Sequence, residues 1–202
     1  MIAGELYSAN DPELLKMRER AEDLCMEFNK TSTRDPKRGE ILAKLMPNSS
    51  RDVFLRGPIQ FDYGFLTTMG EGTYANYNLI VLDVCPVTIG KNVYMASNVS
   101  LLTAMHPLVA EERISFDDPK FGWTDLEYAK PIVIEDNVWI GGSVTVLGGV
   151  KIGKDSVIGA GSVVTRDIPS GVIAYGNPCK AHRQITEKDR VKYHPELLGK
   201  EE

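Results

Sequence analysis

The sequence predicts a mainly β fold: a parallel β-helix that carries an N-terminal helical segment and one long excursion loop. Three observations lead to this prediction. Aliphatic residues recur every six positions over a long stretch, the first 56 residues follow a helical spacing instead, and the six-residue register is interrupted once in mid-chain. A chain of 202 residues, 43% of them hydrophobic, is large enough to bury a core as one unit.

The six-residue repeat is clearest in the C-terminal half. Branched aliphatic residues follow one another at this spacing without a break: Ile134, Ile140, Val146, Ile152, Ile158 and Val164. A glycine directly follows several of them, as at Gly141, Gly153 and Gly159, and residues 87–101 continue the same register upstream. A period of six fits short strands separated by corners, where the inward residue is aliphatic and the next one is small. Three such strands form a coil, and stacked coils bury a continuous core.

Residues 1–56 depart from the repeat and are predicted to form a helical cap over one end of the coils. Asp11-Pro12 and Asp35-Pro36 each place a capping carboxylate before a proline suited to the first helical turn. Apolar residues then recur at three- and four-residue spacing, which predicts a helix with one apolar stripe facing the body of the protein: Leu14, Met17, Ala21, Leu24, Cys25 and Phe28.

A loop is predicted to leave the coils at about residue 104 and to return at about residue 130. Leu101 and Ile134 are separated by 33 positions, which is not a multiple of six. The loop contains His106 and an unusual density of aromatic residues for an exposed segment: Phe116, Phe121, Trp123 and Tyr128. We expect it to cover a second surface. Residues 57–181, including this loop, form the predicted β-helix domain.

Other features of the chain exclude several classes of protein. Residues 182–202 are polar and are predicted to form a surface helix and a tail. A net charge of -5 argues against a nucleic-acid partner. The chain has no apolar run long enough to span a membrane and no secretory leader, so we expect a cytoplasmic protein. Cys25, Cys85 and Cys179 lie far apart without a CxxC pair, and we expect buried thiols.

Several blocks outside the repeat give the sequence a specific resemblance. They are Ala3-Gly4-Glu5-Leu6-Tyr7, Asp11-Pro12-Glu13-Leu14, Phe61-Asp62-Tyr63-Gly64, Ala75-Asn76-Tyr77-Asn78, Leu82-Asp83-Val84, His106-Pro107 and Asn177-Pro178-Cys179. With the repeats, these blocks resemble the hexapeptide-repeat acyltransferases, and among them the maltose and galactoside O-acetyltransferase group, along nearly the whole chain. The resemblance implies a left-handed β-helix, a homotrimer with active sites between subunits, and acetyl transfer from acetyl-CoA to a sugar hydroxyl.

The resemblance also implies roles for individual residues. It makes His106 the catalytic residue. It surrounds the sugar acceptor with Asn76, Asp11, Asp83, Tyr74 and Asp62. It brings acetyl-CoA against Trp139, Gly142, Ala160, Thr165, Arg166, Lys180 and Arg183. From the residues alone, Asp11 is equally a helix N-cap, Asn76 and Asp83 are equally corner residues, and Tyr74 is equally a core residue.

The proposed chemistry follows from what acetyl transfer requires. A sugar hydroxyl is a weak acid, so a base must take its proton as it attacks a thioester, and histidine suits that role near neutral pH. Of His106, His182 and His194, only His106 lies on the excursion loop. No Ser, Cys or Lys stands in a nucleophile motif, which favours direct attack over a covalent acetyl-enzyme. The backbone amide of Gly142 is the candidate donor to the oxyanion.

Alternatives from other classes remain open at this point. A γ-type carbonic anhydrase needs three histidines on adjacent coils, which this chain lacks, and we expect no metal cofactor. A non-catalytic hexapeptide-repeat scaffold would retain the fold without the activity. An acetyltransferase of a non-sugar acceptor, such as serine or an antibiotic, would share the chemistry, although the Gly4-Glu5-Leu6-Tyr7 block argues against it. The sequence does not specify which sugar or which hydroxyl reacts.

Overall fold

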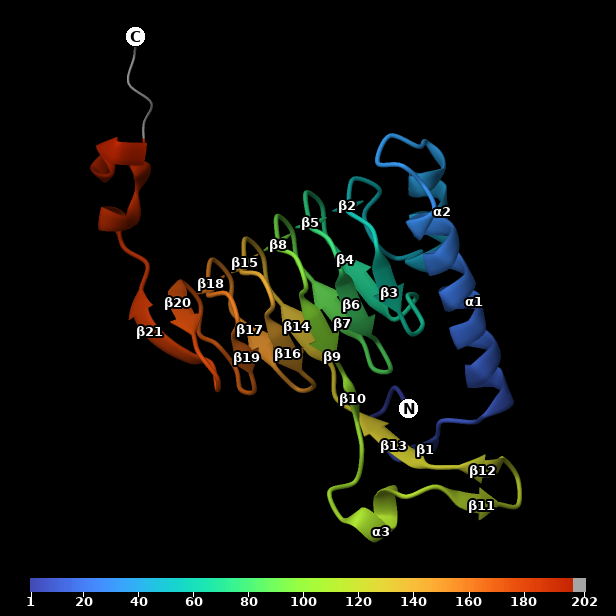
Figure 1. The fold of residues 1–202 in the computed structure, drawn as a ribbon. Helices are drawn as coiled ribbons and strands as arrows, with labels where there is room; N and C mark the ends of the chain where they lie inside the picture. The colour runs from blue at the N-terminus through green and yellow to red at the C-terminus, as the bar shows by residue number, and fades with distance from the viewer. Residues whose placement is uncertain (198–202) are drawn as a thin grey trace.

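The computed structural model describes residues 1–197 and shows a stack of triangular coils with helices at one end (Figure 1). Each complete coil contributes one strand to each of three sheets, which form the three faces of the stack and are parallel except where β21 joins the longest one. The stack has about six turns. The predicted fold class, a mainly β parallel β-helix with N-terminal helices and an excursion loop, is confirmed.

The three faces differ in length. The four-stranded face consists of β17 (Lys151–Ile152), β14 (Ile132–Ile134), β7 (Val87–Ile89) and β4 (Thr67–Met69). The seven-stranded face consists of β2 (Phe54–Leu55), β5 (Tyr74–Ala75), β8 (Tyr94–Met95), β15 (Trp139–Ile140), β18 (Val157–Ile158), β20 (Val172–Tyr175) and β21 (Lys180–Gln184). The five-stranded face consists of β19 (Val163–Val164), β16 (Thr145–Leu147), β9 (Ser100–Leu102), β6 (Leu79–Leu82) and β3 (Ile59–Phe61).

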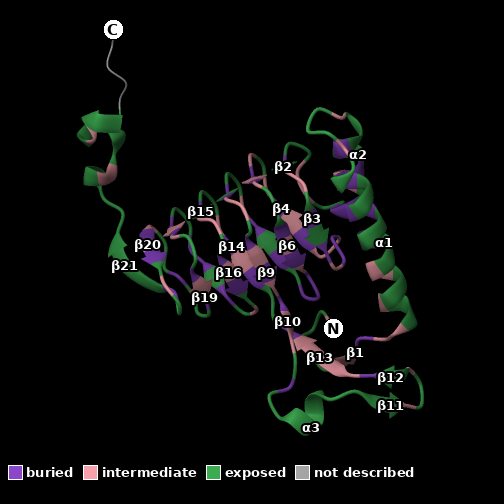
Figure 2. Ribbon diagram, viewed as in Figure 1, coloured by how far each residue is buried: buried purple, intermediate pink, exposed green. Residues whose placement is uncertain are grey.

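The aliphatic residues of the repeat form the core. The six that define the repeat are all 0% exposed: Ile134, Ile140, Val146, Ile152, Ile158 and Val164. Parallel pairing stacks like residues on one another, so that Ile140 lies between Met95 and Ile158 in adjacent coils. Figure 2 shows buried segments, in purple, recurring along the stack among exposed and partly exposed ones. Successive aliphatic residues of the repeat are therefore the inward-facing residues of successive faces of the coil.

The corners of the coils explain the small residues of the repeat. A Cβ added to Gly141 would lie 2.6 Å from the backbone nitrogen of Ala160 in the next coil, closer than side chains approach. Other corners use asparagine in the left-handed conformation, as at Asn137 with a φ of 59°. Asn137 donates a hydrogen bond of 2.9 Å to Asp155 Oδ1 and accepts one of 3.2 Å from Asn92. These contacts link neighbouring corners.

Two helices cover the end of the stack, as predicted. Helix α1 (Pro12–Asn29) begins at the Asp11 cap, and α2 (Lys37–Leu45) begins just after Pro36. Helix α1 buries Ala21, Leu24, Cys25 and Phe28 against the first coil. The coils begin at β2, a few residues before position 57. All three cysteines are free and buried, as expected.

The excursion between β9 and β14 forms structure of its own below the coils (Figure 1). It comprises β10 (Ala104–Met105), α3 (Ala110–Arg113), β11 (Phe116–Asp118), β12 (Gly122–Thr124) and β13 (Leu126–Ala129). Strands β11 and β12 form an antiparallel hairpin. Strand β13 lies between β10 and β1 (Tyr7–Ser8) in a three-stranded antiparallel sheet. The N-terminus and the excursion are therefore joined.

The C-terminal segment differs from the predicted surface helix. Strand β21 turns back along β20, and three short 3-10 helices follow it: Glu187–Asp189, Val191–Tyr193 and Pro195–Leu197. Pro195 disfavours the α-helical conformation at the preceding residue, and His194 has a ψ of 65°. The predicted tail beyond residue 197 lies outside the described residues. Among residues 1–197, no helix has the length and apolar character needed to cross a membrane.

Candidate active site

His106 is positioned by the three-stranded antiparallel sheet, outside the coils. Met105 on β10 pairs with Tyr128 on β13, so the next residue, His106, comes opposite Glu127. On its other side, Glu127 pairs with Tyr7 of β1. The register therefore aligns Tyr7, Glu127 and His106 across the sheet, although they are far apart in the sequence.

Two carboxylates face the imidazole of His106. Asp125 Oδ2 lies 3.5 Å from Nδ1, and Glu127 Oε1 lies 3.9 Å from Nε2. Tyr7 Oη donates a hydrogen bond of 2.5 Å to the other oxygen of Glu127, which restrains that carboxylate. The side chain of His106 is 45% exposed, so a ligand can reach it. This arrangement places an accessible imidazole between two carboxylates.

Asp62 lies at the end of β3, near this group. Burial raises the pKa of Asp62 to about 6, the charge of Asp83 adds to the shift, and Arg18 opposes it. Arg18, on α1, donates a hydrogen bond of 2.6 Å to the carbonyl of Ala9. Arg18 and Asp62 both line a groove of about 400 Å³ between α1 and the five-stranded face, a volume typical of small-molecule sites.

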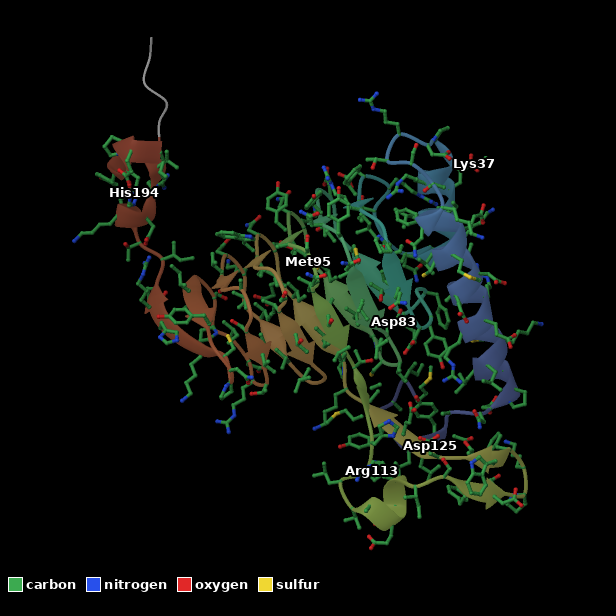
Figure 3. The ribbon with its side chains drawn as sticks, viewed as in Figure 1. Lys37, Asp83, Met95, Arg113, Asp125 and His194 are labelled. Carbon is green, nitrogen blue, oxygen red and sulfur yellow. The ribbon has the colours of Figure 1, made fainter. Side chains whose placement is uncertain are left out.

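Asp83 has a structural role in this arrangement. It is 0% exposed, and Figure 3 shows it at the helix end of the coils, away from Asp125. Its Oδ1 accepts a hydrogen bond of 2.9 Å from the Tyr63 amide, and its Oδ2 accepts one of 2.8 Å from the Thr67 hydroxyl. Each oxygen of this buried carboxylate is thus engaged by the protein itself. Asp83 therefore holds the turn between β3 and β4, and its acceptor role stays a prediction.

Asp11 caps α1 at the junction with the excursion. Its Oδ1 accepts a hydrogen bond of 2.9 Å from the Glu13 amide. The neighbouring Asn10 donates to the carbonyl of Trp123, which ties the start of the helix to β12. Asp11 therefore lies on the same side of the molecule as the three-stranded sheet, and its second carboxylate oxygen remains available beside the N-cap bond.

A second group of candidate residues follows the seven-stranded face and its corner with the five-stranded face. Tyr74 pairs with Tyr94, which pairs with Trp139, so the three side chains form an outward column. Asn76 follows β5 at this corner, and its side chain accepts a hydrogen bond from the Tyr77 amide. The column and the corner face outward, and Trp139 is 56% exposed.

Gly142 and Ala160 lie on the same corner, farther along the stack. The amide of Gly161 donates a hydrogen bond of 2.8 Å to the carbonyl of Gly142. The amides of Gly141 and Ser143 donate to neighbouring coils, whereas within residues 1–197 the intervening Gly142 amide forms no backbone hydrogen bond. A free amide at a corner of small residues can donate to a ligand that approaches closely.

The basic candidates lie toward the C-terminal end of the stack. Lys180 and Arg183 lie on β21, whereas Thr165 and Arg166 follow β19 at a different corner. All four are exposed. Arg183 donates hydrogen bonds of 2.6 and 2.9 Å to the two carboxylate oxygens of Asp189. A phosphate at Arg183 would therefore have to compete with Asp189 for the guanidinium.

Within one chain, the candidates form separate groups. His106, Asp11 and Asp62 lie with the N-terminal segment and the excursion, whereas Asn76, Trp139 and Gly142 follow the opposite edge of the five-stranded face. The residue-by-residue prediction did not include three side chains of the group around His106, Tyr7, Asp125 and Glu127, or Arg18 in the neighbouring groove. The alternation of Asp125 and Glu127 just before the chain rejoins the coils was the available signal, because alternate strand residues share a face.

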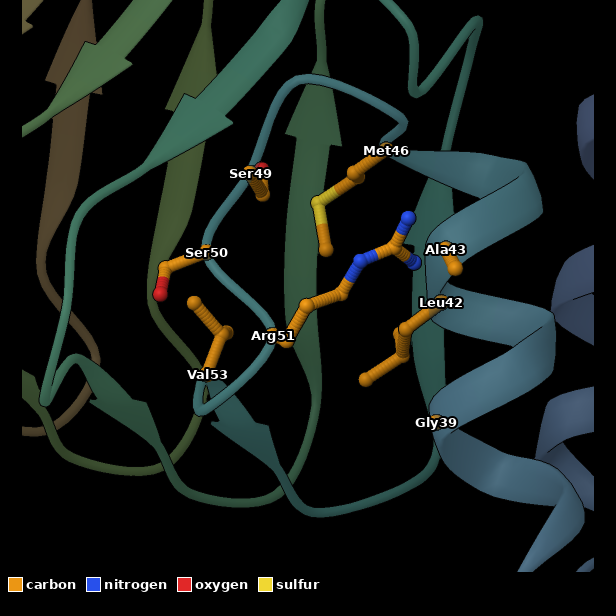
Figure 4. A pocket seen from close by; sticks show the side chains of 8 residues that line it. All are labelled: Gly39, Leu42, Ala43, Met46, Ser49, Ser50, Arg51 and Val53. Carbon is orange, nitrogen blue, oxygen red and sulfur yellow. The ribbon is translucent and has the colours of Figure 1, made fainter.

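A small cavity near α2 is not a substrate site. It is lined by Gly39, Leu42, Ala43, Met46, Ser49, Ser50, Arg51 and Val53, as Figure 4 shows. Its volume is about 20 Å³, which is enough for about one water molecule. The cavity belongs to the contact between the helical cap and the first coil.

Comparison with known proteins identifies both parts of the chain. Residues 1–49 match the maltose acetyltransferase hexapeptide capping motif, and residues 131–166 match the bacterial transferase hexapeptide model of six repeats. A galactoside O-acetyltransferase of Lactococcus lactis is 40% identical over 94% of this chain and 88% of its own length.

Solved structures agree with the sequence comparison. The crystal structure of a maltose O-acetyltransferase from Clostridium difficile 630 superposes with a TM-score of 0.84 at 43% identity, covering 92% of this chain and 95% of that one. A galactoside acetyltransferase in complex with coenzyme A also has a TM-score of 0.84, at 39% identity over 93% and 90% of the two chains. The resemblance inferred from the sequence is thereby confirmed, and the chain belongs to the hexapeptide-repeat acetyltransferases of the maltose and galactoside O-acetyltransferase group.

Proposed function

We propose that this chain transfers an acetyl group from acetyl-CoA to a hydroxyl of a sugar of the maltose, glucose or galactoside type, with His106 as general base. The observation that carries the proposal is the exposed imidazole of His106 with carboxylates facing both ring nitrogens. The names of the close relatives support the acetyl donor and the class of acceptor.

The proposed reaction is a direct attack. His106 takes the proton of the acceptor hydroxyl while the hydroxyl oxygen attacks the thioester carbonyl, and CoA leaves as the tetrahedral intermediate collapses. The imidazolium that forms is stabilised by the negative charges of Asp125 and Glu127. The proton then passes to the leaving sulfur. No acetyl group is transferred to the protein, in keeping with the burial of all three cysteines.

The acceptor and acetyl-CoA are proposed to meet between subunits of a homotrimer. Asp11 and Asp62 would bind acceptor hydroxyls beside His106, whereas Asn76 and Tyr74 of the neighbouring subunit would close the pocket. Trp139, Ala160 and the free Gly142 amide would face the thioester and pantetheine arm, with Gly142 as the oxyanion donor. Thr165, Arg166, Lys180 and Arg183 would bind the rest of the coenzyme. The separation of the two groups of candidates within one chain supports this arrangement.

The primary test measures CoA release from acetyl-CoA with a panel of sugars, serine and chloramphenicol. Sugar-dependent release is expected in the wild type, and His106→Ala should lower kcat/KM by about 100-fold or more, the range of general-base catalysis. His194→Ala, which removes another exposed histidine, is the matched control and should retain activity. Release stimulated by serine or chloramphenicol alone would refute the sugar acceptor, and failure of the chain to bind acetyl-CoA would favour the scaffold.

The shared site is tested separately with mixed trimers. His106→Ala chains and Gly142→Trp chains should each be inactive, because one lacks the base and the other blocks the thioester position. If residues from two subunits form each site, trimers containing both kinds of chain regain part of the activity. Verified mixed trimers without any recovery would place the whole site in one subunit.

A further inference from the structure

His106, Asp125 and Glu127, here called the His106 triad, also have the composition and geometry of a metal site. Each residue offers one ligand atom, and these three atoms lie within 4.8 Å of one another. The triad differs from a group of surface acids because it contains an imidazole, which is the preferred nitrogen ligand of zinc and neighbouring transition metals.

The sheet fixes where the three side chains emerge. Glu127 lies on the central strand, β13, and His106 directly follows the last pair between β10 and β13. Asp125 precedes β13 and lies two residues from Glu127, so both carboxylates emerge on the same face. Ligands carried by paired strands are held more precisely than ligands on free loops.

The three ligand atoms are close enough for side-chain rotation to gather them around one ion, because they lie within 4.8 Å of one another. Zinc bonds of about 2.0–2.1 Å place neighbouring ligand atoms about 3.3 Å apart. The two separations at His106 are 3.5 Å to Asp125 and 3.9 Å to Glu127. These two distances start from opposite ring nitrogens, Nδ1 and Nε2, and only one of them can bind a given ion, so one carboxylate must turn toward the nitrogen that the other carboxylate faces.

The surroundings favour a bound cation. Tyr7 holds the second oxygen of Glu127, as the outer partner of a metal-ligating carboxylate commonly does. With His106 neutral, the triad carries two negative charges. The exposed side chain of His106 leaves an entry path and room for water to complete the coordination.

We propose that the His106 triad binds a divalent transition-metal ion of the zinc class, and that the bound ion inhibits acetyl transfer. Inhibition follows because the metal takes the imidazole lone pair that would accept the proton of the acceptor. The binding half of this proposal stands on the triad alone, and the inhibitory half rests on the function proposed above.

Metal binding is tested on the full chain without substrates, by calorimetric titration with Zn²⁺ after chelator treatment. One ion per chain is expected. Glu127→Gln and Asp125→Asn should each weaken binding by at least about 10-fold, and Tyr7→Phe should weaken it by about 10-fold through Glu127. His194→Asn is the matched control, because His194 Nδ1 also lies 3.1 Å from a carboxylate, that of Glu196, and it should leave the affinity unchanged.

A second measurement uses only the wild type, so it does not depend on whether the variants fold. Co²⁺ added to the wild type should give the visible absorption of a tetrahedral nitrogen and oxygen site, and Zn²⁺ should displace it. Binding that is unchanged in Asp125→Asn and Glu127→Gln, or that is lost equally in His194→Asn, would overturn the site. Failure of the wild type to bind either ion would do the same.

The inhibitory half is tested by acetyl transfer at rising Zn²⁺ concentration. Zinc should lower the apparent kcat in proportion to the fraction of zinc-loaded chains, because these chains lack a free base, and a chelator should restore the rate. Undiminished transfer by zinc-loaded protein would overturn inhibition. Zinc bound at the triad of a chain that acetylates no acceptor would leave the binding half intact while the proposed function fails, so the two failures are distinguishable.

Discussion

The coils and the three-stranded sheet are built by opposite strategies. In the coils, each inward residue rests on an equivalent residue of the next turn, as Ile140 rests between Met95 and Ile158. In the sheet, Tyr7, Glu127 and His106 meet once: β1 pairs with β13 although Tyr7 and Glu127 are 120 residues apart, and β10 pairs with β13 across the excursion. The coils repeat one contact many times, whereas the candidate site depends on contacts that occur a single time.

This difference separates stability from chemistry. A repeated core spreads its energy over many similar contacts, and neighbouring coils support one another. The sheet outside the coils contains few fully buried side chains, and its polar groups are oriented by single hydrogen bonds such as that from Tyr7 to Glu127. Substitutions in the coils should therefore change the free energy of unfolding, and substitutions in the sheet should change catalysis.

The largest effect on stability is expected from Ile152→Ala in the coils. Ile152 is 0% exposed, and its truncation leaves a cavity between adjacent turns. The free energy of unfolding, measured by urea denaturation, should fall by about 2–5 kcal/mol. The adjacent Lys151→Ala is the control, because it removes only an exposed ion pair with Glu135 and should cost far less. Equal losses from the two variants would contradict the repeated-core account.

A smaller effect, with a distinct pH dependence, is expected from Asp62→Asn beside the site. Its pKa, raised from 3.8 to about 6, means that the folded chain holds the proton more tightly than the unfolded chain. The contribution of Asp62 to stability therefore falls as pH rises through about 4 to 6. Asp62→Asn should raise the free energy of unfolding by about 1–3 kcal/mol at pH 7 and leave it nearly unchanged near about pH 4.

Asp52→Asn provides the control of opposite sign. The Ser50 hydroxyl holds the pKa of the exposed Asp52 below its usual value, so its ionised form stabilises the fold above that pKa. This variant should lose stability at neutral pH and not in acid. If Asp62→Asn instead destabilised the protein at pH 7, the cost of burying this carboxylate would be outweighed by contacts that the charge makes.

The same contrast explains what could be predicted from the sequence. A repeated contact leaves a repeated signal, so the six-residue spacing identified the coils and the inward residues from Ile134 to Val164. Local chemistry identified the Asp11 cap, because the capping carboxylate and the proline are adjacent. The start of the coils at β2 carried less signal, because that coil lacks the regular spacing.

The unrepeated parts could not be predicted in this way. Tyr7 pairs with Glu127 across a sequence separation that is unrelated to the six-residue repeat. Neither segment contains a pattern that indicates which other segment it pairs with. Asp83 occupies a block that suggested sugar binding, yet its burial depends on the turn that closes over it. The C-terminal segment forms 3-10 helices in place of the predicted surface helix. The prediction rested on polar composition, which does not show where residues such as Pro195 interrupt an α-helix.

The smallest effect is expected where the coils meet the candidate coenzyme site, at Lys180 on β21. Lysine binds a phosphate as a point charge, whereas arginine can form two parallel hydrogen bonds with it. Lys180→Arg should lower the KM of acetyl-CoA by up to about fivefold, equivalent to about 1 kcal/mol, and leave kcat unchanged because the phosphates lie far from the thioester. Lys154→Arg, an exposed coil lysine, is the matched control in steady-state kinetics. An equal change in both variants would mean that the effect comes from the overall positive charge of the surface. Lys180 would then not be a coenzyme contact.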